Sequence, residues 1–234
     1  MGKIINGTDV WYLNAVKKIY ISDLTVDGTH KRPTTNGKIV FDCESAVFKN
    51  INLTKECTVY NVFEQVQTKT AIKDVKMKNV KAFPSLAHNI LNLYNIADNA
   101  TIEISDCDLD LNVANTNPVR LSNLSNASNV TITFKNVNWT YDNMAITEDG
   151  KKWAGLVLIQ PFSTDKADFR RKGEDQTLDF YKSWNFIFDN CTYNGEKVTA
   201  NNFGTKQQVI CPCDINADAQ VEDVETLGFN ITFK

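Results

Sequence analysis

The stretch Ile132-Thr133-Phe134-Lys135-Asn136-Val137-Asn138-Trp139 decides the fold, because its pattern recurs along the chain. Apolar residues occupy the positions four and two before Asn136, and the positions one and three after it. We call the central Asp or Asn of this phrase the anchor. Six copies are clear, and their anchors are Asp23, Asn50, Asn79, Asp106, Asn136 and Asn190.

The spacing of the anchors is nearly constant. Successive anchors are 27, 29, 27, 30 and 54 residues apart, and the last interval is twice 27. A fixed period in this range is typical of stacked repeat architectures. Because the repeated phrase alternates as a strand does, the sequence predicts a β-solenoid.

Most copies of the phrase follow a second apolar segment that also has the pattern of a strand. Turn residues such as Asn, Ser, Asp and Gly separate the segments. Helical patterns are weak, although residues 168–181 and 87–93 could each begin a short helix. The second segments are residues 37–41, 58–63, 90–95, 118–123 and 156–161, with 208–212 and 229–233 forming a last pair.

Many short strands also suit a β-sandwich or a barrel, but the repeat favours a parallel β-helix. In such a coil, equivalent residues of successive turns stack at roughly 4.8 Å, which selects one residue type for each place. Asp and Asn suit the anchor because their side chains bond nearby backbone and tolerate a left-handed bend. Stacked Asn amides can also bond one another along the coil.

The sequence therefore predicts one all-β domain over residues 1–234. With a rung every ~28 residues, this length gives a β-helix of about six to eight rungs. Residues 1–18 are expected to form an N-terminal cap, in which Val10 to Leu13 cover the open end of the coil.

One segment breaks the period. Residues 141–182 combine a single recognisable strand pattern with a long polar stretch that is rich in charge. Long insertions in repeat folds project from one face and often bind a partner. A solvated surface loop is an equally good interpretation of this insertion.

The composition excludes several classes of partner. Hydrophobic residues make up 42% of the chain and charged residues 23%, which indicates a globular protein rather than a disordered one. A net charge of −3 provides no field that would capture nucleic acid or an anionic membrane. No stretch approaches the ~20 apolar residues that span a bilayer, and residues 1–18 lack the apolar centre of a signal peptide. The chain is therefore expected to be made in a cytoplasm.

The cysteines and histidines do not suggest a metal site. Cys107 and Cys191 directly follow an anchor, where the other copies carry Leu, Ile or Val, so they are expected to be buried hydrophobes. Four further cysteines show no metal-binding spacing, and the two histidines lie in turn-like contexts. We expect no metal and no cofactor. These residues are Cys43, Cys57, Cys211, Cys213, His30 and His88.

Three alternating aspartates are the best candidates for chemistry. Asp106, Asp108 and Asp110 would point to one face of a strand, where they could bind a cation or form a glycosidase pair. Alternate residues lie about 7 Å apart, within the range of inverting glycosidases. Arg120 and Lys135 could pair with these aspartates at the surface. Because Asp106 is an anchor, the repeat already explains it, and a surface role accounts for the other two.

The remaining motifs favour a protein without catalysis. The chain has no GxSxG elbow, no HExxH and no glycine-rich phosphate loop. Aromatic residues could line a carbohydrate groove, but two of them share one repeat position, which favours a stacking ladder inside the fold. We therefore expect no catalytic, cofactor-binding or metal-binding residues. The aromatic residues are Trp139, Tyr141, Trp153 and Tyr193.

Four stretches of this chain resemble structural proteins of tailed bacteriophages. The stretches are residues 117–123 (NPVRLSN), 130–141 (VTITFKNVNWTY), 153–156 (WAGL) and 190–195 (NCTYNG), and the resemblance covers roughly residues 75–200. Those phage proteins are similar to pectate-lyase-like right-handed β-helices and are assigned to the virion. The resemblance implies a right-handed coil and a virion component such as a capsid decoration protein or a head fibre. The calcium-binding aspartates and catalytic arginine of pectate lyases have no matching motif here.

The leading hypothesis is a non-enzymatic virion structural protein that decorates or projects from the capsid. Its partners would be the major capsid protein or other virion proteins, and it could also bind further copies of itself. One alternative is a carbohydrate-binding or polysaccharide-degrading appendage that uses Asp108 and Asp110. Another is a structural component of the tail or baseplate.

Overall fold

The structure is a computed structural model of the chain. It describes residues 2–5, 11–27, 37–55, 57, 61–67, 70–82, 89–110, 118–122, 125–140, 156–159, 179–201, 210–214, 219–220 and 227–234. The described part is all-β with almost no helix, as the sequence predicts. Residues 89–93 form a strand rather than the start of a helix, because their side chains are buried on both faces.

Sixteen strands and one short 3-10 helix make up the described elements. The strands are β1 (Gly2–Ile5), β2 (Trp11–Asp27), β3 (Gly37–Leu53), β4 (Asn61–Gln65), β5 (Ile72–Ala82), β6 (Asn89–Leu93), β7 (Ile96–Asp110), β8 (Val119–Leu121), β9 (Thr131–Thr140), β10 (Val157–Ile159), β11 (Asn185–Asp189), β12 (Thr192–Tyr193), β13 (Glu196–Lys197), β14 (Ile210–Asp214), β15 (Ala219–Gln220) and β16 (Asn230–Phe233). The helix η1 is Asp179–Ser183.

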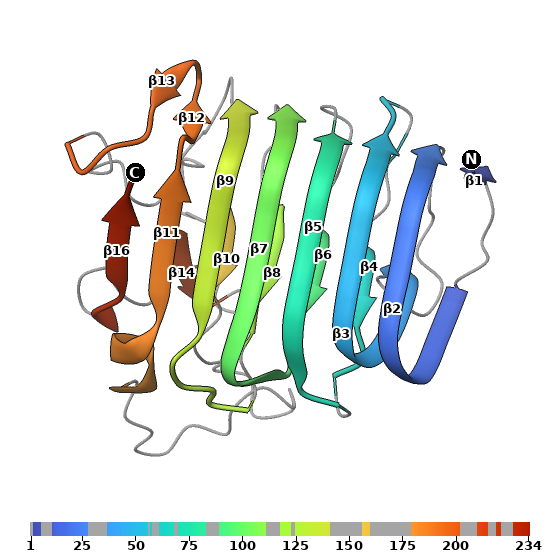
Figure 1. The fold of residues 1–234 in the computed structure, drawn as a ribbon, viewed down its shortest axis with the longest axis horizontal. Coiled ribbons are helices and arrows are strands. Elements are labelled where there is room, and N and C mark those ends of the chain that lie inside the picture. The colour runs from blue at the N-terminus through green and yellow to red at the C-terminus, as the bar shows by residue number, and fades with distance from the viewer. Residues whose placement is uncertain are drawn as a thin grey trace.

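The strands form a curled, mainly parallel sheet that is like a β-solenoid (Figure 1). A front stack holds β1, β2, β3, β5, β7, β9, β11 and β16 in that order, and a back stack holds β4, β6, β8, β10 and β14. Strand β3 joins the two stacks, because residues 37–41 pair with β4 and residues 45–53 pair with β5. Only β13 and β15 pair antiparallel among the described strands.

The register of the front stack confirms that the repeated phrases lie side by side. The residues after the first three anchors, Leu24, Ile51 and Val80, pair in succession across β2, β3 and β5. Cys107 pairs in the same way with Val137 across β7 and β9. One repeat of the sequence therefore corresponds to one step from a strand of the front stack to the next.

The doubled interval between Asn136 and Asn190 spans one step of the front stack. Phe134 pairs directly with Phe188, and Asn138 pairs with Thr192, so β11 and β12 lie next to β9. The chain between them includes β10, which lies in the back stack beside β8. The extra length is an insertion within one repeat, of which the structure describes residues 156–159 and 179–182.

The N-terminal segment is part of the sheet. Residues 11–18 lie in β2 and pair with β3, while β1 pairs with β2 along residues 24–27. The described part of the predicted cap is therefore the first strands of the stack.

The anchors reverse the alternation of each strand. In the copy around Asn136, Ile132 and Phe134 point inward before the anchor and Val137 and Trp139 point inward after it. Two successive residues, Lys135 and Asn136, therefore face outward. A left-handed backbone at the anchor makes this possible, and all six anchors have φ between 50° and 58°. Asn and Asp tolerate this conformation better than other residues with a Cβ.

The apolar residues of the phrase fill the space between the two stacks. Phe48 of the front stack lies over Phe63 of the back stack, with ring centroids 4.0 Å apart. Along the front stack, Phe134 stacks on Phe188 at 5.3 Å and Phe188 on Phe233 at 5.7 Å. Burial of one such ring contributes about 1.5–3 kcal/mol, so the stacked rings are a large part of the stabilisation.

The anchor side chains form a hydrogen-bonded ladder across the strands. The Nδ2 of Asn50 donates to Oδ1 of Asp23, and the Nδ2 of Asn79 donates to Oδ1 of Asn50, both at 2.8 Å. The Nδ2 of Asn136 donates to Asp106 and the Nδ2 of Asn190 donates to Asn136, both at 2.9 Å. Each amide thus donates toward the N-terminal strand, and Asn50 and Asn136 also accept from the C-terminal one.

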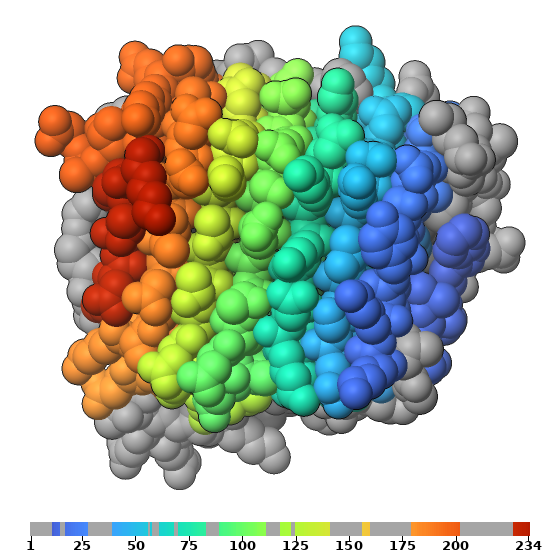
Figure 2. Space-filling model, in the orientation of Figure 1, coloured from blue at the N-terminus to red at the C-terminus, as the bar shows by residue number. Residues whose placement is uncertain are grey.

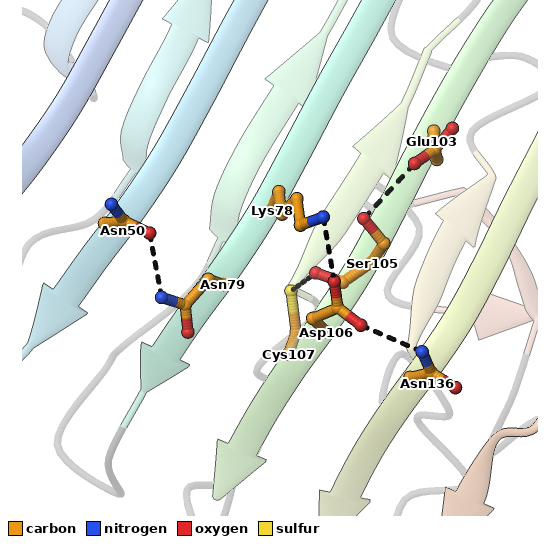
Figure 3. A network of polar contacts seen from close by, with 8 residues as sticks. All are labelled: Asn50, Lys78, Asn79, Glu103, Ser105, Asp106, Cys107 and Asn136. Carbon is orange, nitrogen blue, oxygen red and sulfur yellow. Dashed lines mark hydrogen bonds and ion pairs between the residues drawn. The ribbon is translucent and has the colours of Figure 1, made fainter.

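The ladder is interrupted at Asp106, and the chemistry of the side chain explains why (Figure 3). A carboxylate has no N–H to donate, so Asp106 cannot continue the bond to Asn79. Lys78 fills this place, with its Nζ 3.3 Å from Oδ2 of Asp106. The hydrogen bond from Asn136, followed by the contact with Lys78, lowers the pKa of Asp106. Asp23 begins the ladder, where only an acceptor is needed.

An anchor adopts the left-handed bend and also makes the ladder bonds. Replacement of Asn136 should separate these two roles. Asn136→Ala imposes left-handed strain of about 1–2 kcal/mol and removes two ladder bonds. Asn136→Gly removes the same bonds without the strain. We expect the free energy of unfolding in urea to fall by about 2 kcal/mol for Ala and by about half of that for Gly. Lys135→Ala is the control, and equal losses for Ala and Gly would contradict a role for the bend.

Asp106→Asn should complete the ladder, because the new amide can donate to Asn79. At pH 7 we expect a change within about 1 kcal/mol, since one amide bond replaces an exposed ion pair. Because the pKa of Asp106 is lowered in the fold, its stabilisation exists above the pKa of the unfolded chain and is lost as the pH falls. Urea titrations from pH 7 to pH 2 should therefore show the variant gaining on the wild type below about pH 4. Asp108→Asn is the control. A stability difference between Asp106→Asn and the wild type that stays constant from pH 7 to pH 2 would contradict the assignment.

Candidate functional site

A shallow cleft lies where β5, β7 and β9 end, on the outer side of the front stack. Its volume is about 290 Å³. It contains two of the three aspartates that the sequence singles out. The lining residues are Lys81, Ala82, Asp108, Leu109, Asp110, Asn138 and Thr140.

The repeat brings the polar residues of the cleft together. Lys81, Asp108 and Asn138 each stand two positions after an anchor, and they are paired in register across three adjacent strands. Asp110 and Thr140 stand two positions further and are paired in the same way. Because the strand alternates, all five side chains project from the outer face.

The cleft presents both donors and acceptors. Thr140 Oγ1 donates to Oδ1 of Asp110 at 3.3 Å, and Thr192 Oγ1 donates to Oδ1 of Asn138 at 2.6 Å. The NH₂ group of Asn138 and the ammonium of Lys81 add donors, while the carboxylate of Asp108 adds an acceptor. No ion pair joins Lys81 and Asp108 among the described residues, although their strands place them side by side. Such a mixture suits a hydroxylated ligand.

Asp106 does not belong to the cleft. Its carboxylate accepts from Asn136 and contacts Lys78, within the ladder of anchors. The hypothesis that the repeat explains Asp106 is therefore confirmed. The remaining pair, Asp108 and Asp110, lies on one face about 7 Å apart along the strand.

Arg120 lies elsewhere, and the prediction that it pairs with these aspartates at the surface is wrong. Strand β8 belongs to the back stack, where the Arg120 side chain is 6% exposed. Its guanidinium carbon lies 5.9 Å from the ring centroid of Tyr94. Lys135 remains exposed on β9 of the front stack.

Arg120 instead belongs to a buried polar cluster in the back stack. Glu64 accepts from Asn61 Nδ2 at 3.1 Å and from the hydroxyl of Tyr94 at 3.0 Å. Asn92, which stands between Glu64 and Arg120 in the register, donates to the Tyr94 hydroxyl at 3.1 Å. Burial raises the pKa of the Glu64 carboxyl, against the opposing effects of these hydrogen bonds and of Arg120. The residues of the cluster are buried, so its hydrogen bonds contribute to the stability of the back stack.

Sequence reasoning missed this cluster because the polar residues of β4 and β6 suggest half-exposed strands, yet every residue in them is buried. It also missed the roles of Lys81, Asn138 and Thr140. A signal existed for the cleft, because its residues occupy two equivalent positions of successive repeats.

Trp139 packs inside the fold, as the favoured stacking ladder predicts, and does not line an aromatic groove. Its side chain is fully buried, and the Tyr193 ring lies 5.7 Å away between centroids. The shared repeat position thus reflects packing inside the fold. Tyr141, Trp153, His30 and His88 lie outside the described residues.

Cys43, Cys107 and Cys191 are buried thiols. Burial raises the pKa of Cys43 and Cys191 to about 11 and that of Cys107 to about 12, so all three stay as thiols. Cys57 is also buried, while Cys211 and Cys213 lie in β14. Across the described ranges, no three His, Cys, Asp or Glu side chains gather closely enough to hold a metal ion.

No helix in the described part of the chain combines the length and apolar character needed to cross a membrane. Comparisons of the chain with protein-family models, with curated proteins and with solved structures each found no match.

Proposed function

We propose that this chain is a non-enzymatic structural protein of a bacteriophage virion, where it decorates or projects from the capsid. Its body would be a right-handed parallel β-helix of six to eight rungs that binds other virion proteins. The resemblance of residues 117–141 and 190–195 to tailed-phage structural proteins supports the virion assignment.

The observation that supports a structural role is that the repeated residues hold the fold together. The anchors form the ladder, and the apolar positions fill the interior, so the repeated residues serve rigidity. Long parallel strands with continuous backbone hydrogen bonds resist local opening, which suits a protein on the outside of a particle. The insertion at 141–182 interrupts this repeat and is the segment that we propose contacts a neighbouring virion protein.

Chain connectivity supports the right-handed coil. The chain passes from β4 in the back stack to β5 in the front stack and then returns to β6. Strand β6 pairs parallel with β4, and β5 pairs parallel with β7. Crossovers between parallel strands are right-handed in about 98% of cases. The front stack advances by one strand at each anchor, which agrees with six to eight rungs.

The virion assignment predicts that the chain is present in purified phage particles. Mass spectrometry of separated heads and tails should find the intact chain in the head fraction in a fixed ratio to the major capsid protein. A map of the particle should then show a β-helix on the capsid surface. Presence in tails alone would move the protein to the tail or baseplate, and absence from particles would contradict the proposal.

A second candidate function is carbohydrate binding or cleavage, which the cleft favours. Asp108 and Asp110 lie on one face with hydroxyl-binding donors beside them, at a separation within the range of inverting glycosidases.

Incubation of the protein with capsular polysaccharide of the host tests this alternative. The structural proposal predicts no release of oligosaccharides. Release that Asp108→Ala or Asp110→Ala lowers by at least ~10²-fold, while Lys49→Ala leaves it unchanged, would establish the alternative instead.

A further inference from the structure

The outer face of the front stack is open and large. Figure 2 shows this face, on which the side chains of β2, β3, β5, β7, β9 and β11 lie side by side. With about 4.8 Å between strands and about 3.3 Å between residues, residues 18–27 of β2 and their partners on the other strands cover about 900 Å². A stable interface buries about 800 Å² of each partner, so the face is large enough to bind a protein.

Charge divides this face along the line between β5 and β7. From residue 76 to residue 81, the only charges on β5 are lysines, and from residue 103 to residue 108, the only charges on β7 are carboxylates. Lys78 contacts Asp106 within the chain. In contrast, Lys76, Lys81 and Asp108 take part in no ion pair in the part of the chain that the structure describes. These charges are therefore open to a partner.

The row of residues two positions after the anchors is symmetric about this line. On each side, the charge next to the line is followed by an asparagine and then by a threonine, and the two charges are opposite. All six residues are exposed or half-exposed and paired in register. The row is Thr25, Asn52 and Lys81 on one side, and Asp108, Asn138 and Thr192 on the other.

The row three positions before the anchors has a related order. Opposite charges again flank the line, and each end of the row is a hydrophobic residue. Tyr20 at one end is 60% exposed, and Ile187 at the other end is half-exposed. The row is Tyr20, Val47 and Lys76 on one side, and Glu103, Thr133 and Ile187 on the other.

We propose that this face binds the same face of a second copy of the chain, about a two-fold axis that runs along the strands midway between β5 and β7. A two-fold contact requires a surface that is complementary to itself. This rotation keeps the height of each residue along the strands and places β5 over β7, β3 over β9 and β2 over β11. The proposal does not depend on the virion assignment.

The register then fixes which residues meet. Lys81 of each copy faces Asp108 of the other, and Lys76 faces Glu103, so four pairs of opposite charge join the two copies. Asn52 faces Asn138, and an amide can both donate to and accept from another amide. Opposite charges across an interface favour association and fix its register.

One pair of like charges opposes the contact. Lys49 of β3 and Lys135 of β9 lie at the same height, because both are in register with Lys78 and Ser105. The rotation therefore brings Lys49 of each copy over Lys135 of the other. Like charges in an interface lower the affinity, so we expect a reversible dimer.

Sedimentation velocity over a concentration series tests the association of the full chain. We expect a species of twice 26.4 kDa that dissociates on dilution. An increase from about 0.05 M to about 0.5 M NaCl should weaken this dimer at least ~10-fold, because salt screens the charge pairs. Lys135→Glu should strengthen it at least ~10-fold, since the new carboxylate faces Lys49. A wild type that is monomeric at every concentration, or a dimer that does not respond to salt, would overturn the proposal.

Two charge-reversed variants test the role of the face itself. The variant with Lys76→Glu and Lys81→Glu presents carboxylates on both strands, and the variant with Glu103→Lys and Asp108→Lys presents lysines on both. Each variant alone should be monomeric, whereas an equimolar mixture should form a heterodimer, which also shows that both variants fold. Lys197→Glu on β13, outside the paired rows, is the control and should dimerise like the wild type. Variants that dimerise alone, or a mixture that stays monomeric, would reject the contact.

Cross-linking tests the position of the axis. Two stacked sheets lie about 10 Å apart, within reach of a bifunctional maleimide with a short spacer. A mixture of the Asn52→Cys and Asn138→Cys proteins should therefore become covalently linked, while either variant alone should react no more than the wild type. Either variant alone linking as well as the mixture, or species larger than a dimer, would indicate a different symmetry and reject the two-fold pair.

Discussion

The left-handed bend at the Asp/Asn anchor is the constraint on which the rest of the structure depends. A straight strand would place residues on alternate faces without interruption, and half of the apolar residues in each phrase would face water. The bend reverses the alternation, so residues on both sides of Asn136 point inward. Stacked amides then hold neighbouring bends at the same height. The interior, the register and the outer face all follow from this one conformation.

Charge on the outer face reinforces the register. Strand β5 presents lysines and β7 presents carboxylates, and the pairing sets Lys76 beside Glu103 and Lys81 beside Asp108. No ion pair joins either of these neighbours in the described part of the chain, and exposed opposite charges contribute little stability. A shift by one residue would nevertheless separate these charges and turn the apolar residues outward. The cleft lies on this same outer face, at the ends of β5, β7 and β9.

The back stack obeys a different rule from the front stack. Glu64, Asn92 and Arg120 lie in strands whose residues are all buried, so their polar groups depend on partners within the protein. A buried polar group without a partner would cost more free energy than one hydrogen bond contributes. Each side chain of the cluster is therefore suited only to its particular neighbours. At the other extreme, β2 carries aromatic residues that are exposed to water.

The sequence by itself determined the strands, the anchors, the inward positions and the burial of Cys107 and Cys191, because alternation and left-handed preference involve residues close in the chain. Only the tertiary structure decided that the interval from Asn136 to Asn190 is one step and that Arg120 belongs to the back stack. It also decided that Lys81, Asp108 and Asn138 share a cleft. These features depend on which distant segments pair and what covers them, and neighbouring residues do not encode that information.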